Sequence, residues 1–72
     1  MTKETFVKIM KNILSDLPDM HWNSDTESLL RDLGRKFERS LLSAEEVALA
    51  IEKEFPLVMN RQVEHLILKA LK

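Results

Sequence analysis

The residues best suited to chemistry lie in one short stretch, Asp16–Asp25, which reads DLPDMHWNSD. It holds three aspartates, one of the two histidines and the only tryptophan of the chain. Aspartate and histidine are common ligands of Ca²⁺ and of transition metals. The stretch is therefore either a metal site or a connection between helices.

A calcium loop requires oxygen ligands at fixed positions, and this stretch lacks several of them. Counted from Asp16, the twelfth residue is Glu27, which suits the bidentate ligand of such a loop. The third and fifth positions are Pro18 and Met20, which carry no side-chain oxygen, and His21 stands where glycine is needed. The motif does not predict a calcium site.

Transition-metal binding and catalysis have equally little support. Asp19, His21 and Asp25 would have to converge from one loop, and His65 is the only other imidazole. With a single glycine, the chain also lacks the glycine-rich turn of a nucleophile elbow or a phosphate-binding loop. We expect no metal, no cofactor and no enzymatic activity.

The composition is typical of a small globular domain. The 72 residues are 44% hydrophobic and 32% charged, with a net charge of −1 and no cysteine. The first segment, MTKETFVKIMKNIL, has no uninterrupted apolar run of the kind found in a signal peptide or membrane span. We expect one cytoplasmic helical domain over residues 1–72.

Apolar spacing predicts helices along the whole chain, and only one glycine and two prolines interrupt it. The predicted fold is all-α, a compact four-helix domain with short connections and helices near residues 3–15, 25–39, 44–54 and 61–71. Capping boxes are expected at Ser24–Glu27 and Ser43–Glu46. A bundle and an orthogonal arrangement are both compatible with the pattern. In either, Pro18 ends the first helix, and Trp22 is a lid on the core or an exposed contact.

Several apolar residues fall outside the predicted inner faces. On the third helix Leu49 points away from the core face, and on the fourth Leu68 points away from a face that includes Leu66. Leu57 and Val58 lie in a connection that would otherwise be polar. These residues are scattered surface leucines, contacts within a doubly covered helix pair, or a partner-binding or dimer interface.

A row of arginines forms the second candidate surface. Arg31, Arg35 and Arg39 recur every fourth residue and so share one face of the second helix. Most such rows are solvated, but arginine is well suited to bidentate contact with carboxylate or phosphate. The row predicts an acidic partner or a phosphate backbone.

The last two helices resemble, in a general way, the helix-turn-helix of small DNA-binding domains. The segments SAEEVALAIEKEF and NRQVEHLILKALK would be the supporting and recognition helices. The resemblance implies DNA contacts by Arg61, Gln62, His65 and Lys69. The connection PLVMN is long for such a turn, and the first of these segments carries four glutamates that would face phosphates.

The leading hypothesis is a small non-enzymatic protein–protein interaction module that acts as a regulator, adaptor or inhibitor by occupying a surface. Its predicted contacts are Arg31, Arg35, Arg39, Leu49, Leu57, Val58, Leu68 and Trp22, toward a protein partner, acidic or a second copy of the chain. The alternative is a DNA-binding transcriptional regulator.

Overall fold

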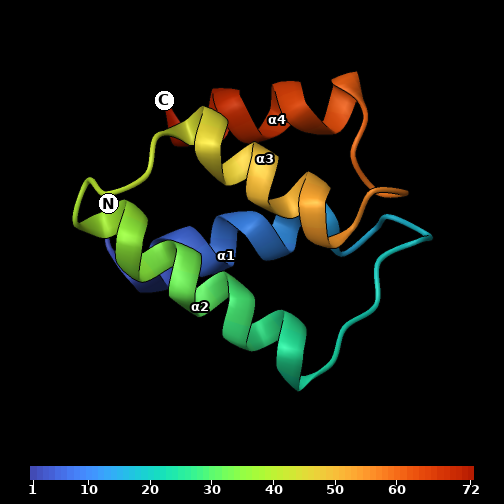
Figure 1. The fold of residues 1–72 in the computed structure, drawn as a ribbon, viewed down its shortest axis with the longest axis horizontal. Helices are drawn as coiled ribbons and strands as arrows, with labels where there is room; N and C mark the ends of the chain where they lie inside the picture. Colours follow the sequence, from blue (N-terminus) through green and yellow to red (C-terminus); the bar gives the residue numbers. More distant parts are fainter.

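The computed structural model describes residues 1–72 and contains four α-helices and no strand. The helices are α1 (Lys3–Leu14), α2 (Ser24–Glu38), α3 (Ala44–Glu54) and α4 (Arg61–Leu71). Figure 1 shows that α2 runs back beside α1, and that α4 runs back across α3. The predicted all-α four-helix domain is confirmed, with helix ends within one residue of those predicted.

Polar side chains begin each helix by accepting a bond from a backbone amide that the helix leaves unpaired. Thr2, Ser43 and Asn60 do this for α1, α3 and α4, and at α3 both bonds of the predicted capping box are present. The capping box predicted at Ser24 is wrong. Asn23 caps α2 instead, since its side chain accepts from the Thr26 amide at 3.0 Å.

The apolar faces of the four helices meet in one core of 14 buried side chains. Each helix packs on its neighbour in the chain, and α1 also packs on α4, so the four form a closed ring around the core. Seven large side chains in it are fully buried: Phe6, Met10, Leu14, Leu30, Val47, Ile51 and Ile67.

Gly34 allows α1 and α2 to approach closely. A Cβ atom at this position would lie 3.0 Å from Phe6 Cδ1 and 3.3 Å from the Lys3 carbonyl oxygen. Phe6 in turn packs on Phe37, with ring centroids 5.5 Å apart. Glycine is unfavourable inside a helix, but at this position any larger residue would place a side chain against α1.

None of the four helices combines the length and the apolar character needed to cross a membrane.

Candidate protein-interaction surface

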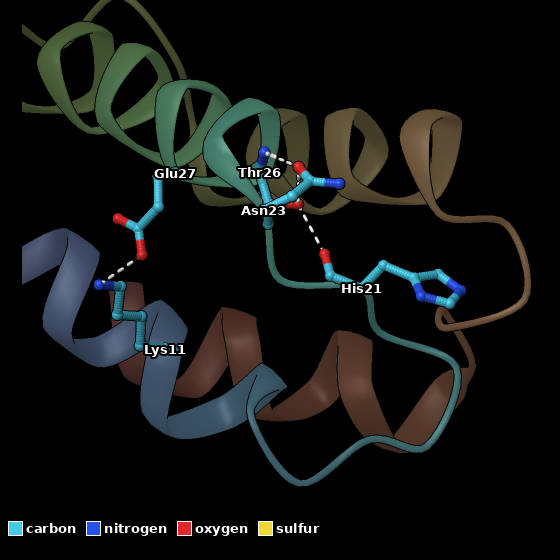
Figure 2. A network of polar contacts seen from close by, with 5 residues as sticks. All are labelled: Lys11, His21, Asn23, Thr26 and Glu27. Carbon is cyan, nitrogen blue, oxygen red and sulfur yellow. Dashed lines mark hydrogen bonds and ion pairs between the residues drawn. The ribbon is translucent and has the colours of Figure 1, made fainter.

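The Asp16–Asp25 stretch is a hydrogen-bonded joint between α1 and α2 (Figure 2). The buried Thr26 hydroxyl donates to the His21 carbonyl oxygen at 2.6 Å and so fixes the loop against the start of α2. Glu27, the residue expected in the capping box or as a calcium ligand, forms an ion pair with Lys11 of α1 at 2.7 Å. No group of three or more metal-ligating side chains lies close enough together to hold a metal ion.

Trp22 is not a lid on the core. Its side chain is 38% exposed, and it lines a surface hollow with Lys11, Ser15 and Glu27. Met20 is the residue of this loop that enters the core. Trp22 therefore remains available as an exposed contact, and it lines a different hollow from Leu41, Leu49 and Leu57.

The turn between α2 and α3 holds an exposed leucine in an ordered backbone. The Leu41 amide donates to the Lys36 carbonyl at 2.8 Å and the Ser40 amide to the Phe37 carbonyl at 3.0 Å, the two bonds of a Schellman motif. Ser40 takes the left-handed conformation, φ 60°, that the motif needs. An apolar residue at the position of Leu41 commonly packs on the last helical turn, but here the facing residue is Lys36. Leu41 is left 64% exposed.

Leu41 and its neighbours line an open depression of about 420 Å³, which we call the turn hollow. Its apolar lining residues are Met1, Phe37, Leu41 and Leu42. A second depression of about 290 Å³, the α3 hollow, continues from it along the outer face of α3. It is lined by Leu42, Glu46, Leu49, Ala50 and Lys53, so the two hollows share Leu42 and Glu46.

The arginine row lies on the outer face of α2. Arg31, Arg35 and Arg39 are all exposed, and none of them forms an ion pair, whereas Lys36 on the same helix pairs with Asp32 at 3.1 Å. Arg39 stands two residues before Leu41. None of the three arginines lines the turn hollow, whose charged lining residues are Glu38 and Glu46.

The predicted leucine surface is only partly present. Leu49 is 62% and Leu57 82% exposed, but they line different hollows, and Leu57 lies beside Asp19 and His21. Val58 is only 4% exposed and belongs to the core, so its assignment to an interface is wrong.

The assignments of Leu66 and Leu68 are reversed. Leu68 is half-buried against the core, whereas Leu66, expected on the inner face, is 49% exposed. The two lie at similar angles on either side of the buried row Val63, Ile67 and Leu71. The sequence of α4 alone therefore does not decide which is covered. Packing of α4 on α1 and α3 covers the side of Leu68.

The residues assigned to DNA contact share the solvent side of α4. Arg61, Gln62, His65 and Lys69 are all exposed. Near the end of this helix Lys72 forms an ion pair with Glu45 of α3, which holds the pKa of Glu45 below its ordinary value, mainly through the side-chain hydrogen bond. The end of the chain after α4 is thus joined to α3 by an opposite-charge contact.

Sequence reasoning missed Leu41, the most exposed apolar residue of the turn hollow. The signal was the pair Leu41–Leu42 between a helix end and the capping serine Ser43. A hydrophobic staple accounts for Leu42 alone, because only the residue before the N-cap takes part in it.

The chain matches no protein-family model, no curated protein and no solved structure.

Proposed function

We propose that this chain is a small non-enzymatic protein–protein interaction module that acts by occupying a surface of its partner. The observation that carries the proposal is Leu41, 64% exposed on a backbone held by two turn hydrogen bonds. A residue whose backbone is already held in place loses less conformational entropy when a partner covers it, so its burial contributes more to affinity. Leu42 and Phe37 extend the contact around it.

The partner's chemistry follows from the groups beside the turn hollow. Arg31, Arg35 and Arg39 present unpaired guanidinium groups on α2, and Arg39 stands two residues before Leu41 in the chain, although none of the three lines the hollow itself. Such a row favours a partner with carboxylates placed around an apolar anchor. The arginines steer the encounter and fix its orientation, while the leucine contact slows dissociation. The module serves as a regulator, adaptor or inhibitor.

The test is affinity capture from the source cell with matched variants. Leu41→Asp places a charge in the centre of the turn hollow and should weaken capture of the partner at least tenfold, the effect of losing an interface hot spot. Leu66→Asp is the control, because Leu66 is also exposed but lies on α4. The proposal fails if both variants capture the same proteins as the unaltered chain while remaining helical by circular dichroism.

DNA binding is the competing outcome, and the shared exposure of Arg61, His65 and Lys69 on α4 is the observation in its favour. A fluorescent DNA duplex at low salt would then bind with an affinity that falls steeply with added salt. Lys69→Ala would weaken this binding, and Leu41→Asp would leave it unchanged. Protein binding through the turn hollow predicts the opposite response of these two variants.

A further inference from the structure

The outer face of α3 carries a short apolar row between two opposite charges. Leu49 and Ala50 lie in the α3 hollow between Glu46 and Lys53. Leu49 is 62% exposed, and Lys53 has no acidic partner in the chain. Glu46 accepts from the Ser43 amide through Oε1 at 2.9 Å, which leaves Oε2 available to a cation.

This row is complementary to itself when two copies of α3 lie antiparallel. A two-fold axis perpendicular to both helices, at the level between Leu49 and Ala50, places each Leu49 beside Leu49 of the other copy. Glu46 and Lys53 lie on opposite sides of this level, each about 5 Å along the helix from it. Each Glu46 therefore stands at the height of Lys53 of the other copy, and two such ion pairs flank the leucine contact.

The directions of the side chains agree with this arrangement. At about 100° per residue, Glu46 and Lys53 point within roughly 20° of each other, and Leu49 lies some 40–60° to one side. Ala50 lies on the other side, where its small side chain permits close approach of the facing helix. The remaining acids of α3 project roughly 80–120° from the seam, past the facing helix. They are Glu45, Glu52 and Glu54.

We propose that the outer face of α3 is a homodimer seam, with Leu49 packed on its counterpart and Glu46 paired with Lys53 of the other copy. The occupant of the α3 hollow is thus a second copy of this chain. The two surfaces share Leu42 and Glu46, but Leu49 and Lys53 do not line the turn hollow, and Leu41 does not line the α3 hollow. Variants at Leu49 and Lys53 therefore test the dimer separately from the protein partner proposed for the turn hollow.

Charge reversal tests the pairing itself. Lys53→Glu places Glu46 opposite a glutamate, and Glu46→Lys places Lys53 opposite a lysine, so each variant alone is repulsive at both pairs. An equimolar mixture of the two restores both attractive pairs in a heterodimer. Sedimentation equilibrium measures all three samples and the unaltered chain. The concentrations extend to roughly millimolar, because interfaces that bury less than about 1,200 Å² are weak and associate only at high concentration.

The expected result is a concentration-dependent dimer of the unaltered chain. The dissociation constant should rise about tenfold or more in each charge-reversed variant and return to within about threefold of the original in the mixture. Leu49→Asp should abolish the dimer, while Leu66→Asp should leave it unchanged. Circular dichroism checks folding, because Glu46→Lys also removes one bond of the α3 capping box.

The inference is overturned if the unaltered chain stays monomeric over this range. It is equally overturned if both charge-reversed variants dimerise as well as the original, or if the folded mixture fails to recover association.

Discussion

At the scale of single residues, Gly34 decides how closely the first two helices pack. A methyl group there would meet the Phe6 ring at 3.0 Å and the Lys3 side chain at 3.2 Å. Phe6 is fully buried and has little freedom to move, because protein cores are close-packed. The low helix propensity of glycine is therefore the smaller of the two effects.

Gly34→Ala should destabilise the protein by about 1 kcal/mol, because an overpacking cost of about 1–3 kcal/mol exceeds a propensity gain of up to about 1 kcal/mol. Denaturant unfolding followed by circular dichroism measures the difference. Ser28→Ala, at an exposed position of the same helix, is the control and should change the stability by less than about 0.5 kcal/mol. A stabilised Gly34→Ala variant would show that α1 and α2 are not in close contact at this point.

At the scale of helices, two neighbouring residues at the start of α2, Asn23 and Ser24, are both of a type that caps helices, but only one of them does so. Asn23 accepts the Thr26 amide, whereas Ser24 is already the first helical residue. Asn23→Ala should therefore cost about 1 kcal/mol of stability, within a range of about 0.5–2 kcal/mol. Ser24→Ala should cost less than about 0.5 kcal/mol. Equal losses in the two variants, measured by thermal or denaturant unfolding, would contradict the assignment of the cap.

The contact between α3 and α4 has a pH signature. Lys72 lowers the pKa of Glu45, first through its hydrogen bond. A carboxyl whose pKa is lower in the folded chain stabilises the fold above its unfolded pKa, and that contribution is lost as the pH falls through the folded value. NMR titration of the Glu45 carboxyl should give a value below the ordinary glutamate range, and Lys72→Gln should raise it. An unchanged titration in this variant would mean that the ion pair does not form in solution.

The helices themselves were predictable because their signals are local. Apolar spacing and the Ser43–Glu46 box depend on neighbours along the chain, and both agree with the structure. The cap of α2 was not predictable, because Ser24 and Asn23 are equally good caps. Asn23 is the cap, and Glu27, the acid expected in a box with Ser24, pairs with Lys11 of α1 instead. Local pattern identifies an element, but the packing between elements selects among its equivalent residues.

The candidate site was less predictable for the same reason. The sequence of α3 defines one core-facing side without ambiguity, so it correctly predicted that Leu49 lies outside that side, and Leu49 is exposed. Leu66 and Leu68 flank the core-facing row almost evenly, so only the packing of α4 on α1 and α3 separates them. The exposure of Leu41 could be predicted only from the Schellman turn, in which the facing residue is Lys36 and offers Leu41 no apolar contact.

At the scale of the whole molecule, two neighbouring surfaces share Leu42 and Glu46 but have different chemistry. The turn hollow holds an exposed leucine beside Glu38 and Glu46, and the arginine row of α2, which suits an acidic protein, lies outside it. The α3 hollow combines a leucine with one charge of each sign, which suits a second copy of the chain. The first surface defines the proposed function, and the second determines whether the protein presents that surface once or twice.

Chemical-shift mapping decides whether a protein partner binds at the turn hollow. Titration of the captured partner into the isotopically labelled chain should shift the amides of Arg39, Leu41 and Leu42 most strongly. Shifts centred instead on Gln62, His65 and Lys69 of α4, with Leu41 unaffected, would contradict binding at the turn hollow.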